Sequence, residues 1–234
     1  MELSIVIPCY KEAKDIEKNI NRIKEYLKEN KIDAEIIAVS DGSPDNTFDI
    51  IKNIPDIKGI GYEKNKGKGG ATRFGIEHAE GDYIIFMDAD LSTDLSAIIP
   101  CLNLLKEGND FVAGSRYDKE SNIKIKQPFK RRFISKCSRI IISSMFHFKL
   151  KDTQCGFKGM NKETAKLLIE KSKMDGFSFD VEYLYIVKLN KRKYISLPVI
   201  WSDDRTSTVS PLRSSIRFFK DLFKIKKHKK EYIA

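Results

Sequence analysis

The sequence predicts an α/β protein with a mostly parallel sheet and helices on both of its faces. Short runs rich in β-branched residues alternate with helical patterns through the first half of the 234-residue chain. The runs are almost continuously apolar, which is typical of strands that are buried on both faces of a parallel sheet. Polar or glycine-rich segments follow the runs, at the strand ends where such sheets bind ligands.

The expected elements alternate in a regular order. Leu3–Pro8 is an apolar strand, and the next segment repeats apolar residues at helical spacing from Ile16 to Leu27. Glu35–Val39 is the second strand, and Ser43-Pro44 has the sequence of an N-cap and first residue of a second helix. The later elements are strands at Ile57–Tyr62, Tyr83–Met87 and Asp110–Ala113, with helices near Ala71–Ala79 and Leu95–Lys106.

Composition excludes several classes of protein. With 41% hydrophobic and 32% charged residues and seven prolines, the chain is neither disordered nor collagen-like, and it is long enough to form a core without covalent or metal cross-links. The amino terminus leads directly into a strand, with no basic leader and no apolar run of membrane-spanning length, so we expect a cytoplasmic protein. The cysteines lack zinc-binding spacing and are expected to be buried thiols: Cys9, Cys101, Cys137 and Cys155.

The positive charge is confined to the second half of the chain. Residues 1–120 contain 16 basic and 23 acidic residues, whereas residues 121–234 contain 27 basic and 10 acidic ones. This asymmetry favours a polyanionic partner, either nucleic acid or an anionic membrane surface, with a solvated lysine-rich surface as the alternative. Nucleic acid is disfavoured because no aromatic stacking platform or recognised binding motif accompanies the charge.

Segments with residues suited to ligand binding or catalysis follow five of the predicted strands. Each of them taken alone is typical of a turn, but five at equivalent positions indicate a ligand site at one edge of the sheet. The segments are Tyr10 with Glu12, Ser40-Asp41-Gly42-Ser43, Asn65-Lys66-Gly67-Lys68-Gly69-Gly70, Asp88-Ala89-Asp90 and Gly114-Ser115-Arg116.

Asp88 and Asp90 indicate a metal site. Two carboxylates one residue apart at a strand end repel each other unless a cation neutralises them. Carboxylate oxygens without His or Cys favour Mg²⁺ or Mn²⁺, and Mg²⁺ is often held by one or two carboxylates together with ligand phosphates. A nucleoside diphosphate would complete such a shell. In the alternative interpretation, Asp90 only caps the following turn.

The glycine-rich segment at residues 67–73 suits a diphosphate. It presents backbone N–H groups together with Lys68 and Arg73 at the start of a helix. It is not a Walker A loop, and the first strand is not followed by the GxGxxG of a dinucleotide-binding protein. The three histidines do not accompany a nucleophile in a pattern typical of hydrolases.

These motifs, in this order, resemble those of the family 2 glycosyltransferases over roughly residues 1 to 210. Residues 4–12 resemble the family's opening strand, which implies that Pro8, Tyr10 and Glu12 contact the nucleotide. Residues 40–47 resemble the element whose second aspartate contacts the base, which implies this role for Asp41. Ser40 departs from the family's first aspartate. Residues 65–69 resemble the family's glycine loop, and residues 88–90 its metal-binding DxD element.

Within the family, the likeness is greatest to polyprenyl-phosphate sugar synthases, including those that glucosylate dolichyl phosphate. It depends on the segments at residues 88–92, 114–116 and 152–158. In those relatives, arginines and a serine contact the acceptor phosphate and the active-site loop. Because Arg132 follows Arg131, the alignment of this chain with the family's arginine is open by one residue. The residues implied to be catalytic are Asp90, Arg116, Arg131 with Ser135, and Arg205.

The resemblance implies an inverting transfer of glucose from UDP-glucose to a polyprenyl phosphate, with Mg²⁺ or Mn²⁺ as cofactor. The alternatives are GDP-mannose or another UDP-sugar as donor, a sugar as acceptor, or a membrane-bound scaffold without catalysis. Asp180 and Glu182 are expected to bind sugar hydroxyls or to orient arginine side chains, and the alternative is a helix-surface pair. The sequence leaves open the prenyl chain and the oligomeric state.

The basic half suits a lipid surface. Pro128–Leu150 mixes aromatic, aliphatic and basic residues and resembles a pair of interfacial helices. Between Arg213 and Lys230 there are eight basic residues and one acid, with an apolar face expected at Ile216, Phe219, Leu222 and Phe223. We therefore expect residues 211–234 to form a basic amphipathic tail that holds a peripheral enzyme on the cytoplasmic face of a membrane. The alternative is a helix that packs on the core.

Overall fold

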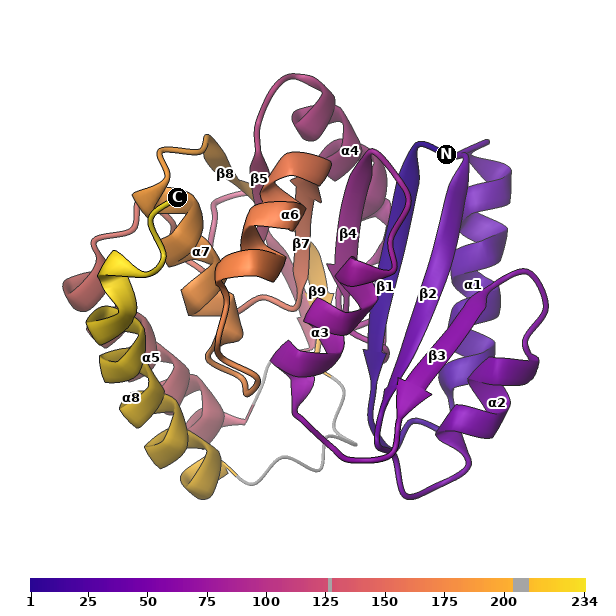
Figure 1. The fold of residues 1–234 in the computed structure, drawn as a ribbon, viewed down its shortest axis with the longest axis horizontal. Helices are drawn as coiled ribbons and strands as arrows, with labels where there is room; N and C mark the ends of the chain where they lie inside the picture. Colours follow the sequence, from indigo (N-terminus) through magenta and orange to yellow (C-terminus); the bar gives the residue numbers. More distant parts are fainter. Residues whose placement is uncertain (126–127, 204–210) are drawn as a thin grey trace.

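The computed structural model describes residues 1–125, 128–203 and 211–234. A seven-stranded sheet with the order β3-β2-β1-β4-β7-β5-β8 forms its centre, and β6 pairs with β9 in a second, two-stranded sheet (Figure 1). The strands are β1 (Leu3–Cys9), β2 (Ala34–Asp41), β3 (Lys58–Tyr62), β4 (Tyr83–Met87), β5 (Phe111–Ser115), β6 (Asn122–Ile125), β7 (Phe157–Asn161), β8 (Tyr194–Pro198) and β9 (Ile200–Ser202).

Helices cover both faces of the large sheet (Figure 1). One face packs against α1, α2 and α4, and the other packs against α3, α6 and α7, with α5 and α8 beyond them. The helices are α1 (Ile16–Glu29), α2 (Thr47–Asn53), α3 (Lys68–Glu77), α4 (Ile98–Lys106), α5 (Phe129–Phe146), α6 (Lys162–Lys171), α7 (Phe179–Leu189) and α8 (Pro211–Lys227), with the short 3₁₀ turns η1 (Leu95–Ala97) and η2 (His228–Lys230).

The prediction of a mostly parallel sheet is confirmed. Strands β3, β2, β1 and β4 pair in parallel, and so do β5 and β8. Strand β7 lies between β4 and β5 and is antiparallel to both. This strand was not predicted from the sequence, because its segment is short and contains Lys158 and Gly159 among apolar residues. Its insertion brings residues 152–158 between the two parallel parts of the sheet.

Side chains alternate between the two faces of the central strands, and this alternation builds the core on both faces of the sheet. In β1, Val6 packs on the face that holds α3 and α7, whereas Ile5 and Ile7 pack on the face that holds α1 and α4. Pro8 is tolerated in this central strand because the pairing of β1 with β4 ends at Val6, so no hydrogen bond to β4 is lost at Pro8.

Three predicted helix boundaries were wrong. Helix α2 begins at Thr47 and not at Pro44, because Asp45 accepts the backbone N–H and the hydroxyl of Thr47 and closes a turn there. Helix α3 begins at Lys68, three residues earlier than expected, because glycines at its first turn allow close packing. The expected pair of helices in residues 128–150 is the single helix α5.

Helix α8 packs on the core through one face. Phe218, Leu222 and Ile225 are buried in the same cluster as α7, and Tyr232 follows them there. Spacings of three and four residues place the three helical side chains on one stripe. Phe223 was predicted on this face, but the structure leaves it 69% exposed, because it lies one residue, about 100° of rotation, from Leu222.

We expect that Leu222→Ala destabilises the protein by about 2–5 kcal/mol, because it leaves a cavity in the core. The control Phe223→Ala removes an exposed ring and should change the free energy of unfolding by less than about 0.5 kcal/mol. Chemical denaturation followed by circular dichroism measures both. Equal, small effects would contradict the packing of α8 on the core.

Candidate active site

The five predicted site segments meet at one edge of the large sheet, and the one after β3, residues 65–70, contacts Asp41 and Asp88 there. Parallel strands end at the same edge, so Tyr10 after β1, Asp41 at the end of β2, Asp88 after β4 and Arg116 after β5 all lie along it. The order of the motifs in the sequence predicted this placement. The structure adds the contacts that fix each side chain.

The Asp88–Asp90 turn is held by the segment before β7, by α1 and by a bond within the turn itself. The backbone N–H of Asp88 donates to the carbonyl of Gly156 at 3.1 Å, and the buried Asn19 of α1 donates to the carbonyl of Ala89 at 2.9 Å. Asp90 accepts the backbone N–H of Ser92 at 2.9 Å, so it caps the following turn, as the alternative interpretation expected. Leu91 has a φ of 53°, a conformation that costs a non-glycine residue roughly 1–2 kcal/mol and that these contacts enforce.

Asp88 forms an ion pair with Lys68, the first residue of α3. Both side chains are about three-quarters buried. Gly156 lies against the same carboxylate, since a Cβ built there would overlap Oδ2 of Asp88. Only glycine therefore fits at position 156 with Asp88 in this place.

The charges at this point are strongly coupled. Burial, and then the neighbouring Asp88, raise the pKa of Asp90 above its ordinary value. Burial alone would lower the pKa of Lys68, but Asp88 and then Asp180 outweigh it and raise that pKa. Asp88 and Asp90 thus share the positive charge of Lys68. A divalent cation would relieve the repulsion that remains between these two carboxylates.

Asp41 anchors the glycine loop. Its carboxylate accepts the hydroxyl of Tyr62 at 2.8 Å, the side-chain amide of Asn65 at 2.9 Å and the backbone N–H groups of Lys66 and Gly67 at 2.8 and 2.9 Å. These bonds fix the loop that leads into Lys68. Burial, and then Asp41, raise the pKa of the Tyr62 hydroxyl.

The remaining residues predicted on the donor side differ in their surroundings. Tyr10 is exposed after β1, and the backbone N–H of Glu12 donates to the hydroxyl of Thr47 at 2.9 Å. Pro8 is half-buried near the end of β1. Arg73 forms an ion pair with Asp175 in the loop between α6 and α7, and not with the Asp88 carboxylate. Its predicted contact with a diphosphate stays a prediction.

Arg116 is held by a bidentate ion pair with Asp152. Nε and Nη2 donate to the two carboxylate oxygens at 2.7 and 3.0 Å, and the backbone N–H of Arg116 adds a third bond at 3.0 Å. Burial alone would raise the pKa of Asp152, but Arg116 outweighs it and holds that pKa below its ordinary value. The pair is pre-organised at the end of β5.

Helix α5 adds a polar cluster beside Arg116. The hydroxyls of Ser135 and Tyr117 lie 3.2 Å apart, and the guanidinium of Arg139 lies 3.6 Å from the centre of the Tyr117 ring. The buried Nε of Arg139 has no hydrogen-bond partner among the described residues. Arg139 was not predicted as a site residue, although it follows Ser135 by four residues, which is one helical turn.

Asp180 and Glu182 are buried at the start of α7, so their interpretation as a helix-surface pair was wrong. Asp180 accepts from Nζ of the fully buried Lys158 at 2.6 Å. Burial raises the pKa of Asp180, against the opposite effect of Lys158 and then of Lys68. Sequence alone gave no signal for Lys158, because a lysine in a strand is normally placed at the surface.

Two predicted catalytic arginines are not among the placed side chains. Arg205 lies outside the described residues, and Arg131 belongs to α5, but its side chain is not described. Their predicted roles beside Arg116 and Ser135 stay predictions.

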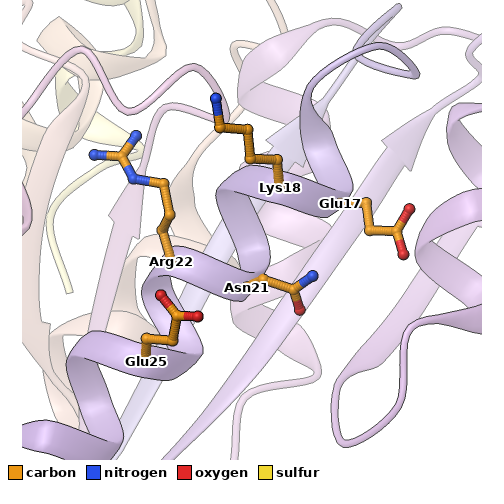
Figure 2. A pocket seen from close by; sticks show the side chains of 5 residues that line it. All are labelled: Glu17, Lys18, Asn21, Arg22 and Glu25. Atoms are coloured by element: carbon orange, nitrogen blue, oxygen red, sulfur yellow. The ribbon is translucent and has the colours of Figure 1, made fainter.

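A shallow depression on α1 does not form part of the site. Figure 2 shows Glu17, Lys18, Asn21, Arg22 and Glu25 around it, all from one exposed helix. A single helix face cannot enclose a ligand, and none of these residues contacts the strand-end edge in the described hydrogen bonds.

The donor set at Asp88 and Asp90 fits a divalent cation. Among the described residues, no group of three or more His, Cys, Asp or Glu side chains is arranged to hold a metal ion. The protein would therefore supply the two carboxylates, and the phosphates of a donor would supply further oxygens, which is a common arrangement for Mg²⁺. The coupled charges of Asp88 and Asp90 support this fit.

The fold and this site define a class of protein, the glycosyltransferases with a GT-A type nucleotide-sugar fold. The model of "Glycosyl transferase family 2" matches residues 4–168, and the chain belongs to this family. The sequence prediction of the family, the fold and the enzyme class is confirmed.

The chain is similar to proteins named dolichyl-phosphate β-glucosyltransferase. One from Trichomonas vaginalis is 30% identical over 95% of this chain and 72% of its own length. One from Homo sapiens is 30% identical over 96% and 75%. The fold is also similar to that of glucosyl-3-phosphoglycerate synthase from Mycobacterium tuberculosis in complex with Mn²⁺, UDP and phosphoglyceric acid, with a TM-score of 0.71 at 17% identity, covering 97% of this chain and 78% of the other.

We expect that Asp152→Asn destabilises the protein by about 3–5 kcal/mol at neutral pH, because it leaves the buried Arg116 charge uncompensated. The pKa of Asp152 is lowered by folding, so its stabilising effect is full above the unfolded pKa of about 3.9 and disappears as the pH falls through the folded-state pKa. The difference between the variant and the wild type should therefore shrink in acid. Urea denaturation at a series of pH values measures this.

Asp56→Asn is the matched control. Asp56 also pairs with a basic residue, Lys24, but its side chain is 84% exposed, so the variant should match the wild type at every pH. A gap between Asp152→Asn and the wild type that is small or independent of pH would contradict the buried pair.

Proposed function

We propose that this chain transfers glucose from UDP-glucose to dolichyl phosphate, with inversion at the anomeric carbon. The names of the relatives at about 30% identity support the glucosyl group and the acceptor. The Mn²⁺ and UDP bound by the structural neighbour support the donor class. The local likeness at residues 88–92 and 152–158 favours glucose over mannose.

One observation carries the proposal. The segment before β7 contacts both halves of the candidate site, since Gly156 lies against Asp88 and Asp152 holds Arg116. The positions 152 and 156 are only four residues apart. A carboxylate pair suited to a metal-bound diphosphate and a cation suited to a phosphate are therefore neighbours, which is what transfer from a nucleotide sugar to a lipid phosphate requires.

The chemistry needs positioning more than proton removal. A phosphate monoester has a second pKa near 6, so at neutral pH the acceptor oxygen is already largely anionic. That oxygen forms a bond to the anomeric carbon while the bond to the UDP oxygen breaks, and UDP leaves with the electron pair. Mg²⁺ or Mn²⁺ at Asp88 and Asp90 would supply compensation for the charge that develops on the diphosphate.

Lys68 and Arg116 provide the fixed positive charges of this proposal. Lys68 lies at the N-terminus of α3, where the helix dipole also favours an anion. Arg116 is oriented by Asp152, and its remaining donors, with Ser135 and Arg139 nearby, face the acceptor side in this proposal. Arg131 and Arg205 are proposed to join them on the basis of the family resemblance.

An anionic lipid surface is the proposed partner of α5 and α8. No helix in the described part of the chain is long and apolar enough to span a bilayer. Phe129, Phe133 and Ile140 of α5 and Phe223 of α8 are each at least 60% exposed. Lys226 of α8 contacts the end of α5 at Met145, so both helices lie side by side (Figure 1). Exposed basic residues flank these rings: Arg132, Lys136, Arg217, Lys220, Lys224 and Lys227.

The transfer assay tests the proposal directly. Purified protein with dolichyl phosphate and Mn²⁺ should form a glycolipid from UDP-glucose at least tenfold faster than from UDP-GlcNAc, UDP-galactose or GDP-mannose. Mass spectrometry detects the product, and NMR of its anomeric proton should show the β configuration. A preference for another donor, or for a free sugar as acceptor, would show that the proposed substrates are wrong.

Two variants connect the assay to the carboxylate pair. Asp90→Asn and Gly156→Ala should each weaken Mn²⁺-dependent UDP binding at least tenfold, about 1.4 kcal/mol, the first by removing a charge and the second by displacing Asp88. Asp56→Asn is the control, because it removes the charge of an exposed carboxylate that lies outside the candidate site. Titration calorimetry with and without EDTA measures this, and unchanged affinity in Asp90→Asn would remove the metal assignment.

Membrane binding has its own expected outcome. Phe133→Ala with Phe223→Ala should reduce co-sedimentation with phosphatidylcholine–phosphatidylserine vesicles several-fold, and raising the salt from 0.1 M to 0.5 M should reduce it further, because salt screens surface charge over about 10 Å or less. Phe48→Ala removes an exposed ring from α2 and should leave binding unchanged. Salt-independent binding, or equal loss in the control, would contradict the proposed surface.

A further inference from the structure

The loop between α6 and α7, residues 172–178, lies against the start of α3. The backbone N–H of Gly70 donates to the carbonyl of Asp175 at 3.1 Å, and Arg73 forms an ion pair with the Asp175 carboxylate. A Cβ built on Gly69 would stand only 2.6 Å from the carbonyl oxygen of Met174. The loop and the helix start that presents Lys68 therefore form one closely packed unit.

The other side of the loop is held by a buried carboxylate. Glu182, which is fully buried, accepts the backbone N–H groups of Lys173 and Met174 at 2.8 and 2.9 Å. The hydroxyl of Tyr232, close to the end of the chain, donates to the same carboxylate at 2.5 Å. Tyr232 is itself fully buried.

A second contact joins the loop to α8. Ser178 donates to the buried carboxylate of Asp221 at 3.1 Å. Asn190 at the end of α7 holds the last residues of the chain, because it donates to the carbonyl of Tyr232 and accepts the N–H of Ala234, both at 2.8 Å. Both ends of the loop are thus fixed by the C-terminal segment.

The type of contact indicates positioning and not only stability. Burial raises the pKa of Glu182, so keeping a carboxylate there has a cost that a well-packed apolar side chain would avoid. An apolar residue could not, however, satisfy the two backbone N–H groups of Lys173 and Met174. The carboxylate specifies the conformation of the loop, and Tyr232 orients the carboxylate.

We propose that residues 221–234 form a latch that, through the loop at residues 172–178, positions the glycine-rich segment at the start of α3. In this latch Tyr232 acts through Glu182, and Asp221 acts through Ser178, on residues 172–178, which in turn fix residues 66–71 at the start of α3. The role of Lys68 toward a donor diphosphate rests on the proposed function. Tyr232, Glu182, Asp221 and Ser178 are positioning residues, since none of them is placed against the substrate.

Hydrogen exchange followed by mass spectrometry tests the latch without any substrate. Tyr232→Phe removes one hydroxyl and keeps the ring, so the chain should fold, and amides in residues 172–178 and 66–71 should exchange about fivefold faster, as the loss of one hydrogen bond allows. Ser178→Ala should act in the same direction. Residues 16–29 of α1, on the other face of the sheet, should not change.

Tyr185→Phe is the matched control, because this buried tyrosine packs against the Tyr232 ring but donates no described hydrogen bond to Glu182. It should leave exchange in residues 66–71 unchanged. Faster exchange in 172–178 with no change in 66–71 would overturn the latch, and so would a uniform increase that includes α1.

A binding measurement complements the exchange data. Tyr232→Phe should weaken Mn²⁺-dependent UDP binding several-fold and raise the KM for the donor, with kcat at saturating donor unchanged. Wild-type protein that makes no glycolipid would remove the proposed function, while the exchange result would still decide the latch. UDP affinity and exchange in residues 66–71 equal to the wild type would overturn the latch whatever the transfer assay gives.

Discussion

The candidate site depends on one constraint, that buried charges must be neutralised by opposite charges or satisfied by hydrogen bonds. From the donor side to the acceptor side, the charges alternate through Asp88, Lys68, Asp180, Lys158, Asp152 and Arg116, linked by ion pairs or by electrostatic coupling. Asp90 lies beside this series without an ion pair among the described residues, and burial, followed by the charge of Asp88, raises its pKa. Within this series, each buried charge thus has an opposite charge beside it, and a divalent cation fits at Asp88 and Asp90, where the carboxylates outnumber the cations.

The antiparallel strand β7 connects the two parts of this network. It separates β4 from β5, and the segment before it brings Gly156 to Asp88 and Asp152 to Arg116, while Lys158 of β7 itself pairs with Asp180. A parallel strand in this place would start at the opposite edge and could not deliver the same residues. One local reversal of strand direction therefore explains how the segment 152–158 serves both sides of the site.

The sequence predicted the parallel part of the fold because apolar strands and amphipathic helices follow simple periodicities. It also predicted Asp41, Asp88, Asp90 and Arg116 at one edge, since strand ends determine that placement. It could not predict β7 or Lys158, because a lysine in a short strand contradicts the usual pattern and is explained only by Asp180, 22 residues later. The face of α8 was misjudged for a related reason: Phe218 and Phe223 are equally apolar, and only tertiary packing separates them.

This arrangement explains the uneven charge of the two halves of the chain. The acidic first half supplies β1 to β5 and the carboxylates at their ends, while the basic second half supplies α8 and also α5, which adjoins Arg116 through Tyr117. A donor that arrives with a divalent cation suits the first half, and an anionic lipid surface suits the second. Because Asp221 of α8 also contacts the loop at residues 172–178, the same helix adjoins the proposed membrane-facing surface and the loop that packs on α3. Leu222 of this helix faces the core, whereas Phe223 faces outward, on the side of the proposed membrane contact.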